Sequence, residues 1–459
     1  MRLFFIFLIP ISIFANLSGV IYDDLSQKPI ASAKIITADG HTYSDINGTY
    51  SFETNATNYH VKAYGYRPYK GSFETNTSAL LRPIKVKALY LSFWGASPKT
   101  KTFKRMMNIV DNTEVNAVIV DVKNEFGLTS YKTGVSAINA KGAFHQRTIK
   151  DIKAFIKIMK AKDIYVIARI VVFKDDLQAS AWPQRALKKY DGSIWRNREK
   201  LAWINPFDPT SHDIALAVAM DAAKLGFDEI NFDYIRFPAY RGIKHTQKNN
   251  EKNRTKAIED FLLHAQTLLE KEGVFISVDT YGQICWASDD TGIGQTVSSL
   301  AKYADYLAPM LYPSGFPKGA MGFKDPTQHD YDIIYQSVTR MHDRIAPIRV
   351  RPWIQSFKDY AHSHKFYRKE AIRDQINACD DANTNGWLVW NPSSRYGINA
   401  YIENKPFLEV TDTVIVVPKK FKKITLKKQA KSCKPLLNKS PYGHYYFNHC
   451  QLHDRGVFK

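Results

Sequence analysis

The segment GFDEINFDYIRFP, residues 226–238, decides the fold predicted for this chain. Glu229, Asn231 and Asp233 share one parity in it, and the apolar residues between them share the other. Successive side chains of a β-strand point to opposite faces, so this strand has one polar and one apolar face. We expect it in an α/β barrel, with the apolar face packed on helices and the polar face inside the barrel.

Strand patterns of this kind alternate with amphipathic helix patterns over residues 86–407. Eight strands and their helices over about 320 residues are typical of a (β/α)8, or TIM, barrel. A doubly wound open sheet is the alternative, but no G-x-G-x-x-G or Walker motif is present to support it. The expected strands are 88–94, 117–123, 165–173, 229–237, 275–281, 306–312, 349–355 and 387–391, and the expected helices include 151–161, 256–271, 331–344 and 369–380.

Two different segments flank the predicted barrel. Residues 17–84 contain short strand patterns separated by turn residues and are expected to form a small all-β sandwich. Residues 411–459 form a basic C-terminal extension with 11 Lys or Arg and two Asp. This extension is expected to act as a solvated or docking segment.

The charge balance indicates the kind of partner. The formal net charge is +20, which favours acidic partners such as a negatively charged cell envelope surface. Nucleic acid is the competing partner, but the chain has no helix-turn-helix signature, zinc finger or aromatic RNP motif, so none is expected.

The N-terminal sequence MRLFFIFLIPISIFA, residues 1–15, has the pattern of a secretory signal peptide. Its apolar run is too short to span a bilayer comfortably, and an uncleaved anchor is the alternative. No later stretch is apolar enough for a transmembrane helix. We expect an exported protein, either periplasmic, associated with the cell envelope or secreted.

The four cysteines fall into two pairs by context. Export permits disulfides, and Cys433 and Cys450 flank a short tail segment and could pair. Cys285 and Cys379 lie in apolar or helical contexts and are predicted to be buried free thiols.

The chemistry of a barrel of this kind lies at the carboxyl ends of its strands. Acids, amides, arginines and aromatic rings occur there in this sequence, and such a mixture suits a sugar, whose rings stack on aromatic faces and whose hydroxyls bind polar groups. The expected substrate-binding residues are Asp121, Lys123, Glu125, Arg169, Asn231, Arg236, Tyr281, Tyr312, Trp353, Gln355, Trp390 and Asn391.

Two carboxyl groups are needed for glycoside hydrolysis, one protonated and one ionised. Asp233 is predicted to be the nucleophile or base, because Arg236 or Arg169 nearby would hold it ionised. Asp279 on the next strand is predicted to be the acid, with Asp121 or Glu125 as the alternative.

Several motifs resemble a bacterial family of barrels assigned to the glycoside hydrolases and first catalogued as a domain of unknown function. They are VDVKNEFG at 120–127, residues 226–238 as quoted, ISVDTYG at 276–282, MLYPS at 310–314 and WNP at 390–392. The family is distantly similar to α-amylase-like glycosidases, and this resemblance implies a nucleophile at Asp233. Those enzymes usually carry a Glu where this chain has Asp279. Residues 19–52 resemble the carboxypeptidase regulatory-like β-sandwich, which implies a spacer or binding accessory.

We therefore expect a glycoside hydrolase acting on a polysaccharide or oligosaccharide. A non-catalytic carbohydrate-binding or envelope-associated protein is the alternative, since it would use the same aromatic residues without needing Asp233. No cofactor or metal is expected, because His-Glu-x-x-His and Cys-x-x-Cys are absent and the tail cysteines and histidines match no standard zinc spacing. A polysaccharide deacetylase would need an Asp/His/His metal set that the sequence does not supply.

Overall fold

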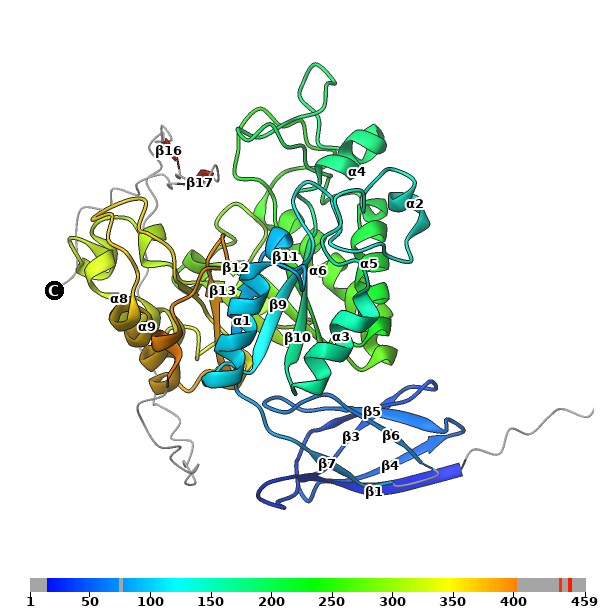
Figure 1. Cartoon of the computed structure of the whole chain (residues 1–459). Helices are drawn as coiled ribbons and strands as arrows, with labels where there is room; N and C mark the ends of the chain where they lie inside the picture. The colour runs from blue at the N-terminus through cyan, green and yellow to red at the C-terminus, as the bar shows by residue number, and fades with distance from the viewer. Residues whose placement is uncertain (1–14, 74–76, 403–436, 440–444, 448–459) are drawn as a thin grey trace, which may run out of the picture.

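The computed structural model of the chain describes residues 15–73, 77–402, 437–439 and 445–447. In this part of the chain, eight parallel strands close into a barrel (Figure 1). The predicted TIM barrel is therefore confirmed. Its strands are β8 (Val86–Leu91), β9 (Ala117–Lys123), β10 (Tyr165–Val171), β11 (Glu229–Asp233), β12 (Phe275–Tyr281), β13 (Tyr306–Met310), β14 (Trp353–Gln355) and β15 (Gly386–Trp390).

Helices surround the barrel and follow most of its strands (Figure 1). Several begin at a side chain that accepts a hydrogen bond from an N-terminal backbone amide, as Asp151 does for α3 and Asn250 for α6. The helices of the described residues are α1 (Lys101–Asn112), α2 (Ser136–Asn139), α3 (Ile152–Ala161), α4 (Asp176–Ala181), α5 (Asp213–Leu225), α6 (Glu251–Leu269), α7 (Val297–Leu300), α8 (Asp330–Thr339) and α9 (Lys369–Asp381).

The alternation of side chains along the strands separates two cores. On β9, Val118, Val120 and Val122 belong to the core between strands and helices, whereas Ala117 and Ile119 belong to the core inside the barrel. The same alternation on β11 directs the apolar side chains toward the helices and leaves its acids and amide buried within the barrel. The two-faced strand predicted from residues 226–238 is thus confirmed.

An all-β domain precedes the barrel, as expected from its strand patterns. One sheet has the order β4-β1-β7 and the other the order β3-β2-β5-β6, and the apolar residues of both form one common core. The strands are β1 (Ala15–Asp23), β2 (Lys34–Ile36), β3 (His41–Tyr43), β4 (Thr49–Thr54), β5 (Asn58–Lys62), β6 (Tyr69–Ser72) and β7 (Ala79–Leu81).

This β-domain is attached to the amino-terminal end of the barrel (Figure 1). Lys62 Nζ lies 2.7 Å from Oδ2 of Asp305 and donates to the carbonyl of Val274 over 2.8 Å, just before β13 and β12. The backbone N–H of Gly65 donates to the hydroxyl of Tyr306 over 3.2 Å. The β-domain therefore covers the end of the barrel opposite the carboxyl ends of its strands.

Some strands are shorter than the sequence predicted. The strand expected at 229–237 ends at Asp233, because Tyr234 has a left-handed φ of 50° that turns the chain. The strand expected at 349–355 begins only at Trp353, since residues Pro347–Arg349 form a 3₁₀ turn and Pro352 has no amide hydrogen to donate. Both departures lie where the chain leaves or enters the barrel.

The remaining predictions divide by where they fall. Cys285 and Cys379 are buried free thiols, as predicted. The signal peptide, the pairing of Cys433 with Cys450 and most of the basic extension lie outside the described residues, which in the tail include only the antiparallel pair β16 (Leu437–Lys439) and β17 (Tyr445–Phe447). None of the helices that the structure describes has the length and apolar character to cross a bilayer.

Candidate active site

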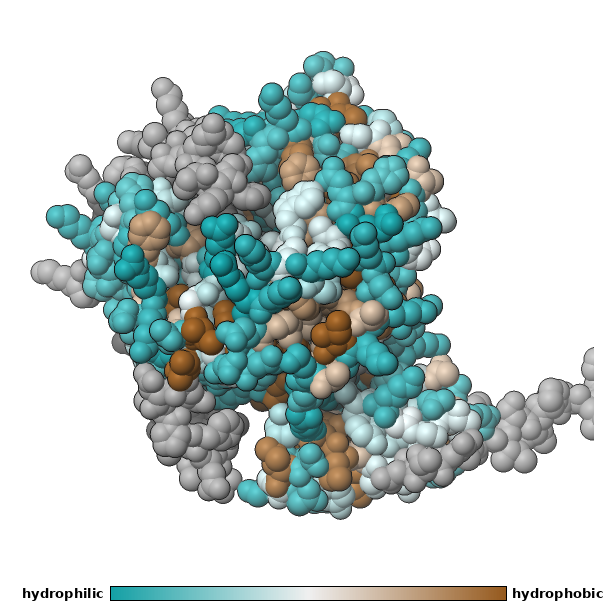
Figure 2. Space-filling view, viewed as in Figure 1, coloured by the Kyte–Doolittle hydropathy of each residue, from teal (hydrophilic) through white to brown (hydrophobic). Residues whose placement is uncertain are grey.

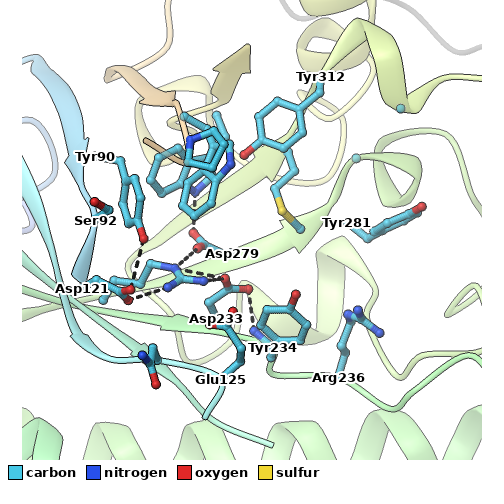
Figure 3. A pocket seen from close by; sticks show the side chains of 18 of the residues that line it. Tyr90, Ser92, Asp121, Glu125, Asp233, Tyr234, Arg236, Asp279, Tyr281 and Tyr312 are labelled. Carbon is cyan, nitrogen blue, oxygen red and sulfur yellow. Dashed lines mark hydrogen bonds and ion pairs between the residues drawn. The ribbon is translucent and has the colours of Figure 1, made fainter. Parts of the chain in front are cut away.

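A cavity of about 240 Å³ opens at the carboxyl ends of the barrel strands. Its walls come from strand ends and from the loops that follow them, so residues far apart in the sequence meet here (Figure 3). Ten of the predicted site residues line this cavity. They are Asp121, Glu125, Arg169, Asp233, Arg236, Asp279, Tyr281, Tyr312, Trp353 and Trp390.

Arg169 joins the carboxylates at the centre of the cavity. Its Nη1 donates to Oδ1 of Asp121 over 2.6 Å, and its Nε donates to Oδ2 of Asp233 over 3.1 Å. Nη2 donates to the same oxygen of Asp233. All three side chains are almost fully buried, so one guanidinium group compensates the charge of two carboxyls that water reaches poorly.

Asp279 is bound differently from Asp233. Its Oδ1 accepts hydrogen bonds from Nδ2 of Asn231 over 2.8 Å and from Nε1 of Trp353 over 2.6 Å. Its Oδ2 lies 3.9 Å from Nε of Arg169. Burial, and then the negative charge of Asp233, raise the pKa of Asp279 well above its ordinary value, although Arg169 opposes the rise.

Asp121 is the third buried carboxyl of this group. Its Oδ2 accepts a hydrogen bond from the Tyr90 hydroxyl over 3.1 Å, while Oδ1 binds Arg169. Burial raises the pKa of Asp121, an effect that Arg169 opposes and the charge of Glu125 reinforces. With both oxygens bound to protein groups, Asp121 is placed to hold Arg169 against Asp233.

The turn after β11 orients Asp233. The backbone N–H of Tyr234 donates to Oδ1 of Asp233 over 2.5 Å, and the backbone carbonyl of Asp233 accepts from Val172 over 2.9 Å. The left-handed conformation of Tyr234 turns the chain away from the strand directly after this bond. Backbone and side chain are thus both held at the position predicted for the nucleophile.

Aromatic rings line the sides of the cavity. Tyr90 stacks on Trp390 with a centroid separation of 4.0 Å, and Trp353 meets Trp390 edge to face. Trp94 and Phe126 are 63% and 48% exposed, which is unusual for such large apolar side chains. Exposed rings beside a cleft of buried acids are suited to stacking on sugar rings.

Four of the residues predicted for the site lie outside the cavity lining. Lys123 is buried and binds Asp175, with Nζ to Oδ2 at 2.6 Å. Asn231 lies beneath the cavity and positions Asp279. Gln355 binds Ser314 and Gln375 within the barrel wall, and Asn391 bonds backbone groups of its own loop and of Ser356.

Sequence reasoning also missed residues that line the cavity. Glu199 arrives from the long connection between β10 and α5, where it pairs with Lys174. Trp94, at the end of the strand expected at 88–94, and Phe126 were not among the residues predicted for the site. The unusual length and the Trp-rich and basic composition of residues 174–209 were the signal that a loop reaches the site.

Comparison with known proteins agrees with this architecture. Residues 88–396 match the model of a family described as "Putative glycosyl hydrolase domain" (DUF4015). The glycoside hydrolase domain of PgaB (BpsB) from Bordetella bronchiseptica superimposes with a TM-score of 0.50 at 13% identity, covering 68% of this chain and 95% of that one. No curated protein matches.

Two further solved structures are similar. A hypothetical protein from Ruminiclostridium thermocellum ATCC 27405 is 31% identical over 42% of this chain and 96% of its own, with a TM-score of 0.37. The spore cortex-lytic enzyme SleL of Bacillus megaterium QM B1551 is 12% identical over 77% of this chain and 88% of its own, with a TM-score of 0.43.

The fold and site define a glycoside hydrolase-like TIM barrel with a carboxylate cluster in its mouth. Because the family model covers about two thirds of the sequence, the chain belongs to the DUF4015 glycosyl hydrolase domain family.

Proposed function

We propose that this protein hydrolyses glycosidic bonds of a polysaccharide, with Asp233 as nucleophile or base and Asp279 as acid. The observation that carries the proposal is that two adjacent carboxyls have different hydrogen-bond and ion-pair partners. Arg169 donates two hydrogen bonds to Asp233 but only approaches Asp279 at 3.9 Å. Burial and the charge of Asp233 raise the pKa of Asp279. One ionised and one protonated carboxyl are what glycoside hydrolysis requires.

The hydrogen bonds of Asp279 indicate where its proton resides. Oδ1 accepts from two donors, Asn231 and Trp353, so it has no need of a proton. The proton therefore belongs on Oδ2, on the side that faces Asp233 and Arg169. From Oδ2 it would pass to the glycosidic oxygen as the bond to the leaving sugar breaks.

Asp233 completes the reaction in one of two ways. As a nucleophile it would form a covalent glycosyl intermediate that water then hydrolyses, and the anomeric configuration would be retained. As a base it would deprotonate a water molecule that attacks the opposite face, and the configuration would invert. Proton NMR of the first-formed product distinguishes the two courses.

Glu125 is the alternative acid. It lines the cavity, is more exposed than Asp279, and its carboxylate makes no ion pair with the residues that the structure describes. It lies close enough to Asp121 and Lys174 for its negative charge to raise the pKa of both groups.

The test compares Asp233→Asn, Asp279→Asn and Glu125→Gln on polysaccharides and on aryl glycosides with good leaving groups. We expect Asp233→Asn to lower kcat about a thousandfold or more on every substrate. Loss of the acid should lower kcat by about 10²–10⁴ on natural linkages. It should lower kcat little on aryl glycosides, because their phenolate leaving group departs without protonation. The acid is whichever variant, Asp279→Asn or Glu125→Gln, shows this contrast.

Two outcomes would contradict the proposal. Unchanged cleavage by Asp233→Asn would remove this residue from the reaction. Glycan binding by the wild-type protein without cleavage of any polysaccharide would favour the alternative, a carbohydrate-binding protein. Circular dichroism and thermal unfolding of each variant would show that the loss of activity is not a loss of fold.

We also propose that the protein acts outside the cytoplasm, at the cell envelope or as a secreted enzyme. The support is the signal-like sequence of residues 1–15. Cell fractionation checks this: full-length protein confined to the cytoplasm would contradict it, and a mature N-terminus near residue 16 would support it.

A further inference from the structure

Arg236 presents a guanidinium group to the cavity at a distance from the Arg169 cluster. It follows the turn that begins at Tyr234, and its side chain points toward the part of the cavity wall that contains Tyr281 (Figure 3). The guanidinium carbon lies 5.2 Å from the ring centroid of Trp203 and 5.2 Å from that of Tyr234. Two aromatic faces therefore hold the group while leaving it in the cavity wall.

The charge of Arg236 is not balanced by a carboxylate. Arg169 binds Asp121 and Asp233, and Lys174 pairs with Glu199, so the neighbouring cations are compensated. Among the described residues Arg236 forms no ion pair, and its one hydrogen bond runs from Nη1 to the carbonyl of Phe237 over 3.2 Å. A half-buried cation without a counter-charge indicates that its partner comes from the ligand.

We propose that Arg236 binds the carboxylate of a uronic acid residue in the substrate, so that the polysaccharide cleaved is an anionic one. This inference rests on the proposed function and names its substrate class. Since Nη1 is engaged by Phe237, Nε and Nη2 remain as two parallel donors. That pair matches the two coplanar oxygens of a carboxylate.

The acids of the cavity do not oppose this binding as strongly as their number implies. Asp233 is compensated by Arg169 and Glu199 by Lys174, and the charge of Glu125 also acts on Lys174, whose pKa it raises. Asp121 is also compensated by Arg169, and burial favours the protonated, neutral form of Asp279, because it raises the pKa of that carboxyl. Burial also raises the pKa of Tyr281, to about 12, and the charge of Arg236 opposes that rise, so Arg236 acts electrostatically on this part of the wall.

The loop beside Arg236 extends the positive surface. Residues 183–200 contain six Lys or Arg and two acids, and the same connection supplies Trp203 to the Arg236 stack. Lys189, Arg198 and Lys200 are exposed. Hydrophilic residues cover most of the visible barrel surface (Figure 2). A polyanionic chain leaving the cavity would meet this loop, which suits a polymer of repeating acidic sugars.

The experiment measures binding, so that it does not depend on catalysis. Calorimetry with the Asp233→Asn protein would use hexamers of galacturonate and of glucuronate, and the same hexamers after reduction of their carboxylates to alcohols. We expect at least one uronate hexamer to bind tighter than its reduced form. Adding Arg236→Gln should weaken that binding roughly ten- to hundredfold and leave the reduced hexamer unaffected.

Two further variants sharpen the result. Arg236→Lys keeps the charge but loses the planar pair of donors, so it should recover only part of the affinity. Arg241→Gln is the matched control, because Arg241 is exposed, lies five residues along and is not part of the cavity lining. It should bind as the parent does. If Arg236→Gln proves unfolded, the lysine variant and the comparison of uronate with reduced hexamer decide the question.

Three outcomes would overturn the inference. The first is equal binding of the uronate and the reduced hexamers, and the second is an unchanged preference of Arg236→Gln for uronate over the reduced hexamer. The third is binding of a sulfated neutral hexamer as tight as that of the uronate hexamer, which would remove the specificity for a carboxylate. Failure of the proposed function would look different, since it would appear as absence of cleavage by the wild-type protein while the binding preference for uronate persists.

Discussion

The indole nitrogen of Trp353 lies 2.6 Å from Oδ1 of Asp279 and donates a hydrogen bond to it. This bond connects β14 to β12 across the barrel interior, two strands that do not pair with each other. It stabilises the ionised form of Asp279 and so opposes the rise in pKa that burial and Asp233 cause. The pKa of the acid proposed for catalysis therefore depends on a residue that also lines the cavity.

Trp353→Phe should shift the pH dependence of activity. Loss of the donor raises the pKa of Asp279 further, so the acid stays protonated to a higher pH and the basic limb of kcat/KM moves up, by about one pH unit. A pH–rate profile measures this. Trp390→Phe is the control, because the Trp390 indole nitrogen has no acceptor among the described residues and should leave the limb in place. A basic limb that does not move in Trp353→Phe would separate Asp279 from the pH dependence.

Asp279→Asn should stabilise the folded protein relative to wild type, and this stabilisation should grow as the pH rises. The ordinary pKa of the carboxyl is 3.8, and its pKa in the folded state is higher, so between these values the unfolded state releases its proton first. The contribution of Asp279 to stability is thus complete below 3.8 and is lost as pH rises to the folded pKa. Each whole-number difference between the two pKa values amounts to about 1.4 kcal/mol.

An asparagine at this position can still accept from Asn231 and Trp353 but has no proton to release. We therefore expect the free energy of unfolding of Asp279→Asn to exceed that of wild type at pH 8. The advantage should vanish near pH 3.5. Urea unfolding at several pH values measures it, and a difference independent of pH would contradict the burial of a protonated carboxyl.

Trp94→Ala should weaken substrate binding without impairing the chemical step. The Trp94 ring is large, exposed and in the cavity wall, but it contacts none of the buried carboxyls by hydrogen bond. We expect KM for a long oligosaccharide to rise about tenfold, equivalent to about 1.4 kcal/mol, with kcat nearly constant. Tyr43→Ala is the control, because it removes a ring of comparable exposure (54%) from the β-domain, at the end of the barrel opposite the cavity. A fall in kcat alone would argue against a stacking role.

Lys62→Met should loosen the junction of the β-domain and the barrel. The Lys62 side chain is only 12% exposed, and the substitution removes its ion pair with Asp305 and its hydrogen bond to the carbonyl of Val274. We expect a loss of roughly 1–3 kcal/mol in the free energy of unfolding. Lys256→Met breaks a far more exposed pair with Asp260 and should cost under about 0.5 kcal/mol. Equal effects of the two substitutions would mean that the junction adds nothing to stability.

The barrel could be predicted because strand and helix periodicities are local. The strands expected at 117–123 and 275–281 have the observed bounds, and the expected helix at 369–380 differs from α9 by one residue. The errors fall where a single residue breaks the local pattern, as Tyr234 does with its positive φ. Such a conformation is imposed by the surrounding structure and leaves no signal in hydrophobic alternation.

The candidate site was predictable only in part. Parity and strand order predict that Asp121, Arg169, Asp233 and Asp279 meet at one mouth, and the structure places all four in the lining of one cavity. Parity could not predict that Lys123 forms an ion pair with Asp175 and so lies outside the cavity lining. Nor could it place Glu199, because a long loop has no periodicity from which to infer where its side chains lie.

The sequence by itself determined the barrel, its two-faced strands and the carboxylates at their ends, because alternation at period two reports which face is buried. Tertiary structure alone decided how these groups share their charges. Arg169 lies on β10, and its three nitrogens can be divided between Asp121 and Asp233 only once β9, β10 and β11 stand side by side. The difference between Asp233 and Asp279 thus arises from which donors lie within hydrogen-bond distance, a property of the folded chain.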